Sequence, residues 1–146
     1  MTKEEIISCF ERGIDCGQVV LLALSENLGI TRDEAMRLGA GLGGGMFDGD
    51  SCGAYLAGII AIGLKSGPTE ELSGEAFQIA KGKVMSAVVR YRAAFQEAFG
   101  SFCCQKLLGY KIPEQMQEAA ESGRMMDFCP ELTEKTIGIL KDILEE

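Results

Sequence analysis

The stretch that decides the fold is residues 74–99, GEAFQIAKGKVMSAVVRYRAAFQEAF. Apolar side chains recur in it at intervals of three and four residues, which places them on one face of an α-helix. The members of this face are Phe77, Ala80, Val84, Val88, Tyr91, Phe95 and Ala98. Gly100 follows, and glycine readily takes the left-handed conformation in which many helices end. The stretch therefore predicts one long amphipathic helix.

Segments on both sides of this helix carry helix-start signals and no alternating strand pattern. Thr2, Asp15 and Thr31 each stand three residues before a Glu or Gln, as in a capping box, and predict helices at about 3–12, 16–28 and 32–40. A helix at about 52–65 is expected after the glycine-rich run that ends at Gly45. Further helices are expected at about 103–108, 113–122 and 130–144, the last two opening at a proline. These are eight candidate segments, and from them we expect an all-α, single-domain bundle of about six or seven helices over residues 1–146.

Composition and charge exclude several classes of protein. The formal net charge is −8, and the 14 basic residues are scattered, which argues against nucleic acid or an anionic membrane as partner. The most apolar stretch, residues 54–64, is about half the roughly 20 residues that a membrane span needs. The first residues lack the layout of a signal peptide, so we expect a cytoplasmic protein whose thiols are reduced at rest.

The chain contains no histidine. This removes the usual general base, the Cys-His dyad and every mixed Cys/His zinc pattern. Chemistry in this chain is therefore expected to depend on its six cysteines.

Four cysteines are predicted to lie where a helix begins: Cys16, Cys52, Cys104 and Cys129. A helix N-terminus favours negative charge and so lowers the pKa of a thiol, and thiolates attack disulfides and bind soft metals. Cys52 is the strongest candidate because it opens an apolar helix directly behind the glycine-rich loop. The alternative is that each of these cysteines only fills space in the core as a small hydrophobic residue.

The residues after Cys52 are small, beginning with Gly53 and Ala54, and so would admit another backbone or a cofactor. Tight helix packing explains the same feature. Cys103 and Cys104 lie about 100° apart on a helix, so only one of them can face a common centre. Cys9 has no start signal beside it and is expected to fill space.

Together these residues resemble the C_GCAxxG_C_C family of small, redox-active bacterial and archaeal proteins, named for separated cysteines around a short motif. The matching motif is Cys52-Gly53-Ala54-Tyr55-Leu56-Ala57-Gly58, one residue longer than the strict Cys-Gly-Ala-x-x-Gly form. The other matches are the segments around Cys16, the glycine run 41–46, Cys104-Gln-Lys-Leu-Leu-Gly109 and Cys129-Pro130. The resemblance selects Cys104 over Cys103 and leaves Cys9 out.

Two functions of different classes follow, and a third is kept beside them. In the first, the four cysteines converge and a pair cycles between dithiol and disulfide, as in a thiol–disulfide oxidoreductase, with Cys52 as the nucleophile and an unidentified redox partner. In the second, Cys16, Cys52, Cys104 and Cys129 bind zinc or an iron–sulfur cluster. In the third, the chain is a helical interaction module whose cysteines are packing. A homodimer is expected from the apolar fraction of 47%.

Overall fold

The computed structural model describes residues 1–145, and within them the chain forms eight α-helices and one short irregular turn. The first half contains α1 (Lys3–Glu11), α2 (Cys16–Leu28), α3 (Arg32–Gly39), the irregular turn η1 (Gly45–Gly49) and α4 (Gly53–Ser66). The second half contains α5 (Gly74–Phe99), α6 (Cys104–Leu108), α7 (Met116–Ser122) and α8 (Arg124–Leu144). The all-α class is confirmed, whereas the expected number of six or seven helices was too low.

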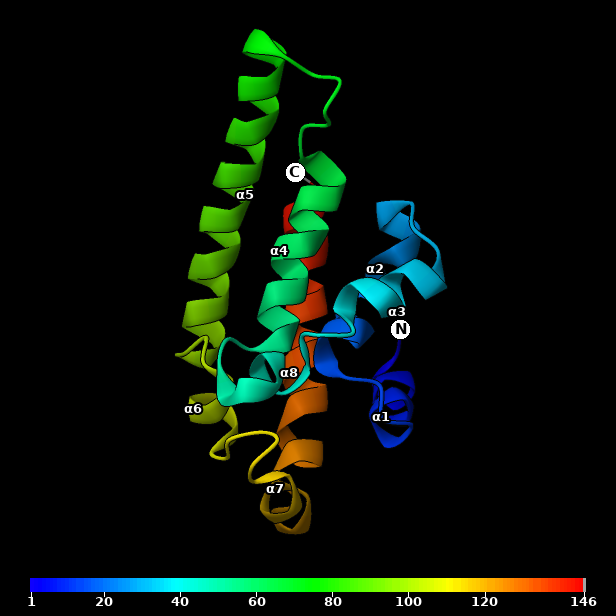
Figure 1. Cartoon of the computed structure of the whole chain (residues 1–146), viewed down its shortest axis with the longest axis vertical. Helices are drawn as coiled ribbons and strands as arrows, with labels where there is room; N and C mark the ends of the chain where they lie inside the picture. The colour runs from blue at the N-terminus through cyan, green and yellow to red at the C-terminus, as the bar shows by residue number, and fades with distance from the viewer. Residues whose placement is uncertain (146) are drawn as a thin grey trace.

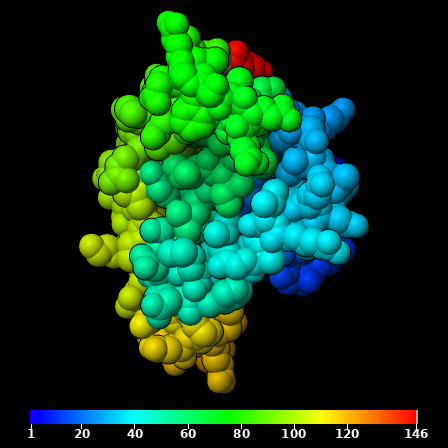
Figure 2. All heavy atoms as spheres, turned by 45° about the horizontal axis from the view of Figure 1, so that its top comes forward, coloured from blue at the N-terminus to red at the C-terminus, as the bar shows by residue number. Residues whose placement is uncertain are grey.

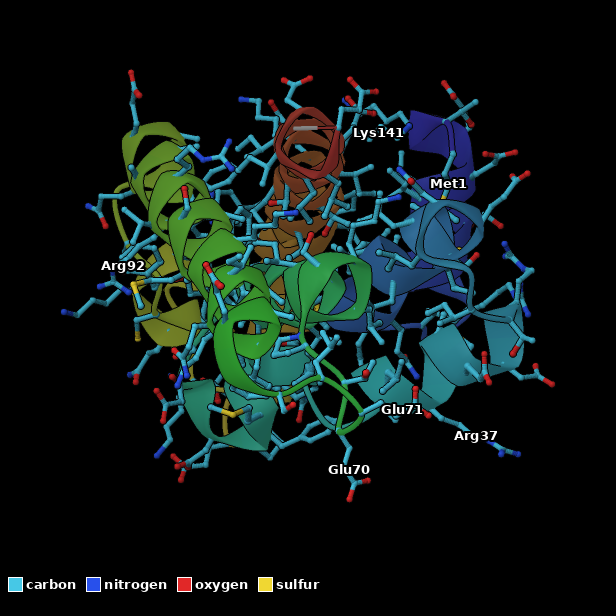
Figure 3. The ribbon with its side chains drawn as sticks, turned by 90° about the horizontal axis from the view of Figure 1, so that it is seen from above. Met1, Arg37, Glu70, Glu71, Arg92 and Lys141 are labelled. Atoms are coloured by element: carbon cyan, nitrogen blue, oxygen red, sulfur yellow. The ribbon has the colours of Figure 1, made fainter. Side chains whose placement is uncertain are left out.

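Four helices, α2, α4, α5 and α8, pack on one another and form the core of the bundle. α1 packs on α8, and α3 packs on α2 (Figure 1). α6, α7 and η1 lie at the lower end of the bundle in that view, where α4 begins. From above, the side chains of Arg37, Glu70, Glu71 and Lys141 point outward from the bundle (Figure 3).

Aromatic rings hold α4 against α5. Tyr91 and Phe95 are fully buried, and the rings of Tyr55 and Tyr91 stack with centroids 5.2 Å apart. The Tyr91 hydroxyl donates to the carbonyl oxygen of Tyr55 at 3.0 Å, so this buried polar group is satisfied. The side chain fits only because Gly58 has no Cβ, since a Cβ there would collide with the Tyr91 ring and hydroxyl.

Local signals place most helix boundaries correctly. α2 and α5 have the predicted bounds, and capping boxes are present at Thr2, Asp15 and Thr31. Left-handed glycines end α2 and α5, at Gly29 with φ 69° and Gly100 with φ 78°. These boundaries depend on hydrogen bonds within a few residues of chain, so sequence alone could find them.

The prediction that the last helix begins at Pro130 was wrong, because α8 begins at Arg124 and Pro130 lies inside it. Proline removes one helical hydrogen bond, but tertiary contacts hold the turn before it. The Arg124 guanidinium donates to the Leu107 carbonyl oxygen at 2.9 Å and lies 4.2 Å from the centre of the Phe128 ring. Residues 112–115 form a turn, so α7 also begins later than predicted, at Met116.

Candidate functional site

A cavity of about 330 Å³ brings together the four cysteines singled out from the sequence. Cys16, Cys52, Cys104 and Cys129 all line it, and they come from four different helices or helix caps. The elements involved meet at the lower end of the bundle in Figure 1. Figure 2 shows η1 and the glycine-rich segment, in cyan, at the surface between α4 and the yellow chain near residue 115.

Two Cys-Gly dipeptides bring Cys16 and Cys52 into contact. Cys16 is the first residue of α2 and Cys52 is the N-cap of α4. A Cβ on Gly53 would lie 2.8 Å from the Cys16 sulfur and 2.5 Å from the Leu42 carbonyl oxygen. A Cβ on Gly17 would lie 3.0 Å from the Gly53 carbonyl oxygen. Glycine after each cysteine is therefore what allows the two helix starts to touch.

Cys104 is held beside Cys52 by backbone hydrogen bonds between two loops. The Cys52 N–H donates to the Phe102 carbonyl oxygen, and the Cys104 N–H donates to the Asp50 carbonyl oxygen, both at 2.6 Å. Gly45 makes room here, because a Cβ on it would lie 2.7 Å from the Cys104 Cβ. These two backbone hydrogen bonds fix the position of Cys104 relative to the start of α4.

Cys129 reaches the same cavity from the interior of α8. It therefore does not lie at a helix N-terminus, and the prediction of a helix start there was wrong. The earlier start of α8 at Arg124 explains the difference. The nearby Arg124 guanidinium lowers the pKa of Cys129, but burial and the charge of Cys52 outweigh it and raise that pKa to about 12.

Cys52 is the thiol most easily ionised. A hydrogen bond from the Cys16 thiol stabilises the Cys52 thiolate, and the backbone N–H groups of Tyr55 and Ala54 stabilise it further. These donors outweigh the cost of burial and lower the pKa of Cys52 from 9.0 to about 7. At neutral pH a large share of Cys52 is therefore the nucleophilic thiolate.

The other three thiols keep their protons. The pKa of Cys16 is raised well above 9.0, because the protonated Cys16 thiol is the donor toward Cys52 and because Cys16 is buried. Burial and the charge of Cys52 raise the pKa of Cys104 to about 11. The cavity therefore holds one thiolate at a time, with neutral thiols around it.

The two other cysteines lie outside the cavity lining. The Cys103 sulfur donates to the Gly49 carbonyl oxygen at 3.4 Å. Cys9 is buried in the core beside α2 and α8. Gly53 lines the cavity, whereas Ala54 is fully buried in the core and contributes its backbone N–H to Cys52.

Sequence reasoning missed the walls of the cavity. Its rim carries Phe47, Met116, Met125, Met126 and Phe128. Met116 and Met126 are 44% and 40% exposed, so these methionines do not fill core space. Phe47 is also exposed, and it stands in a left-handed conformation with φ 55°. The available signal was Met125-Met126 next to Phe128-Cys129, a run of large apolar side chains beside a cysteine.

The thiols of Cys16, Cys52, Cys104 and Cys129 are the donor set available to a soft metal or cluster. Within residues 1–145, no group of three or more His, Cys, Asp and Glu side chains is arranged so that it could hold a metal ion as it stands. In the same part of the chain, no helix has both the length and the apolar character required to cross a membrane.

Comparison with known proteins identifies one family. No curated protein and no solved structure matches the chain. The model of the family described as "Putative redox-active protein (C_GCAxxG_C_C)" matches residues 14–143, which include all four cavity cysteines and exclude Cys9. This match spans most of the chain and agrees with the resemblance carried by the cysteine segments. The chain belongs to this C_GCAxxG_C_C family.

Proposed function

We propose that this chain is a thiol–disulfide redox protein in which Cys52 and Cys16 form the reacting pair. The observation that supports it best is that the starts of α2 and α4 bring the Cys16 and Cys52 thiols together on one cavity, with the Cys16 sulfur against Gly53. There Cys16 lowers the pKa of Cys52 to about 7 and keeps its own proton. One sulfur is a nucleophile at neutral pH and the other is a protonated thiol in contact with it. Dithiol exchange requires an attacking and a resolving thiol arranged in this way.

The reaction consumes a disulfide and conserves atoms and electrons. The Cys52 thiolate attacks one sulfur of the substrate disulfide, which forms a mixed disulfide and releases the other half as a thiolate. That thiolate takes the proton of Cys16. The Cys16 sulfur then attacks the Cys52 sulfur, forms the Cys16–Cys52 disulfide and releases the second half. The substrate gains two electrons and the protein loses two.

Cys104 and Cys129 line the same cavity and stay protonated, so we assign them to a second exchange. In it, the Cys104 and Cys129 thiols reduce the Cys16–Cys52 disulfide. Cys104 and Cys129 become joined as a disulfide, and their two protons go to Cys16 and Cys52, which are thiols again. In the reducing cytoplasm expected from the sequence, both pairs rest as thiols.

The test counts thiols in the full chain after anaerobic purification, reduction and treatment with hydroxyethyl disulfide. In the wild type we expect the loss of at least two thiols per chain. In Cys52→Ser we expect no disulfide at the Cys16–Cys52 pair. In Cys16→Ser we expect a stable mixed disulfide on Cys52, which mass spectrometry detects. Cys9→Ser and Cys103→Ser are matched controls that keep the wild-type reaction. If Cys52→Ser reacts like the wild type, Cys52 is not the nucleophile, and the result favours the alternative that the cysteines only pack in the core.

A second candidate function is a Cys₄ metal or iron–sulfur site, favoured by the convergence of four thiols from separate elements on one cavity. Binding would require the four sulfurs to turn toward a common centre. The test measures the iron and zinc content and the visible absorption of the anaerobically purified protein. Stoichiometric metal that disappears in Cys52→Ser and in Cys129→Ser would replace the dithiol proposal.

We also propose a homodimer that forms through the outer face of α5, which exposes Met85 and Val89 at 62% each. These side chains are one helical turn apart and so form a continuous apolar strip. Sedimentation of the wild type is expected to show a dimer, and a Val89→Glu variant is expected to sediment as a monomer. A monomeric wild type would remove this proposal without affecting the dithiol site.

A further inference from the structure

The cavity around Cys52 has an almost uncharged wall. Apart from its four cysteines, the only ionisable side chain among the described residues that line it is Asp15, the N-cap of α2. Asp15 is half-buried, and burial raises its pKa. No lysine or arginine lines the cavity. An anionic ligand would therefore meet a carboxylate and a thiolate with no cation to neutralise it.

The wall is instead built to contact apolar groups. Phe47, Met116, Met126 and Phe128 stand at the rim, and Leu108 and Ile112 are buried behind them. Methionine and aromatic side chains adapt to apolar and sulfur-containing ligands, because thioethers are polarisable and flexible. A volume of about 330 Å³ lies at the small end of the range for small-molecule sites.

Arg124 and Lys111 lie close to the cavity, and each has partners outside it. The Arg124 guanidinium stacks on Phe128 and donates to Leu107, and Lys111 pairs with Asp48 at 3.5 Å and with Glu114 at 3.6 Å. Neither side chain lines the cavity. Among the described residues, the lining around Cys52 therefore holds no cation, and the charge of Arg124 acts on Cys129 from outside that lining.

We propose that the substrate of the Cys52–Cys16 pair is a small, uncharged, apolar disulfide, and that the cavity discriminates against anionic disulfides such as oxidised glutathione. This inference rests on the proposed dithiol function and names its substrate class. The chemistry is the exchange written above: the apolar disulfide is reduced to two thiol products, and the Cys16 and Cys52 sulfurs become joined. The apolar halves lie against the methionine and phenylalanine rim while the sulfur–sulfur bond reaches Cys52.

The experiment compares three oxidants on the reduced full chain at neutral pH: dipyridyl disulfide, which is uncharged and aromatic, dithiobis(nitrobenzoate), its aromatic anionic counterpart, and oxidised glutathione. Each rate is divided by the rate of the same oxidant with mercaptoethanol, so that intrinsic reactivity cancels. We expect the normalised rate for the uncharged disulfide to exceed both anionic ones by about tenfold or more. A tenfold ratio corresponds to about 1.4 kcal/mol of repulsion between the anionic oxidants and the negative charges of the cavity.

Two charge variants locate the discrimination. Asp15→Asn keeps a good N-cap residue but removes the carboxylate, and Met126→Lys adds a cation at the rim. Both are expected to raise the rate with the anionic oxidants severalfold, and Met126→Lys is expected to lower the rate with dipyridyl disulfide. Leu38→Lys is the matched control, because Leu38 is 42% exposed, close to the 40% of Met126, and lies on α3 outside the cavity lining.

The outcomes separate this inference from the proposed function. Equal normalised rates for all three oxidants, or variants that behave like Leu38→Lys, would overturn the apolar substrate class while the Cys16–Cys52 disulfide still forms. Failure of Cys52→Ser to slow any of the three reactions would overturn the dithiol function itself. Faster normalised reaction with oxidised glutathione would reverse the assignment.

Discussion

At the scale of single residues, the site depends on an asymmetry between two identical side chains. Cys16 lowers the pKa of Cys52, and the backbone N–H groups of Tyr55 and Ala54 at the start of α4 lower it further. Cys16 is the donor toward Cys52, and burial further raises its pKa. In the proposed exchange, this difference makes Cys52 the attacking sulfur and Cys16 the resolving one.

This asymmetry predicts how Cys52 titrates. Thiolate absorbance and alkylation by iodoacetamide are expected to rise with a midpoint near pH 7. In Cys16→Ala the largest stabilising donor is gone, so the midpoint should move up toward the ordinary value of 9.0. Cys9→Ala is the control and should titrate like the wild type. An unchanged midpoint in Cys16→Ala would show that the thiol pair does not set the ionisation of Cys52.

At the scale of elements, two helix starts are joined through glycine. Gly17 and Gly53 follow the two cysteines, and each faces backbone or sulfur at contact distance. The sequence signals predicted helix starts at Cys16 and at about residue 52, close to where α2 and α4 begin. They could not show that the starts touch, because the contact joins segments that are distant in sequence.

Alanine substitutions in α4 separate this contact from helix propensity. Gly53→Ala would place a Cβ 2.8 Å from the Cys16 sulfur and should cost about 1–3 kcal/mol in free energy of unfolding, with a raised pKa of Cys52. Gly63→Ala, in the same helix, meets nothing within 4 Å and should stabilise the protein by about 0.5–1 kcal/mol. Urea unfolding and thiolate titration check both. A Gly53→Ala protein as stable as Gly63→Ala would contradict the close approach of the helix starts.

The η1 segment is the other element that sequence signals did not describe. Gly44, Gly45, Met46 and Phe47 all have positive φ, so the chain makes a left-handed turn that includes two residues with large side chains. Such residues pay a conformational cost that glycine avoids. The turn places Phe47 on the rim of the cavity.

Substitution at Met46 measures that cost. Met46→Gly is expected to leave the protein as stable as the wild type or to stabilise it by up to about 1 kcal/mol, because φ 59° is unfavourable for methionine. Ala93→Gly, at an exposed position inside α5, should instead destabilise it by about 1 kcal/mol. Equal losses in both variants, measured by urea unfolding, would show that the turn at Met46 is not left-handed in solution.

At the scale of the whole molecule, four thiols share one cavity with one negative charge. Ionisation of Cys52 raises the pKa of Cys104 and of Cys129, so each thiol senses the others although they belong to different elements. Folding therefore changes the proton affinity of all four groups. Stability and pH are linked through that change.

The linkage predicts opposite trends on the two sides of pH 9. Between pH 7 and 9, Cys52 binds a proton in the unfolded chain but is ionised in the folded one, so stability should rise, by on the order of 2 kcal/mol. Above pH 9, Cys104 and Cys129 ionise in the unfolded chain but hold their protons in the folded one up to about 11 and 12, so stability should fall. Urea midpoints of the reduced protein measure both trends.

Cys52→Ser is the control for the first trend, since it removes the rise between pH 7 and 9 and leaves the alkaline fall. Stability that decreases steadily from pH 7 upward in the wild type would contradict a lowered pKa of Cys52 in the folded protein.

By itself, the sequence determined the helical class, the bounds of α2 and α5 and the capping boxes, and it singled out the four cysteines that line the cavity. Capping, glycine stops and helical periodicity act within a few residues, so they can be read along the chain. Only the tertiary structure decided the close approach of Cys16 and Cys52, the start of α8 before Pro130, the different pKa values of the thiols and the apolar rim of the cavity. Each of these depends on contacts between segments far apart in the sequence, where burial and neighbouring donors set the energy.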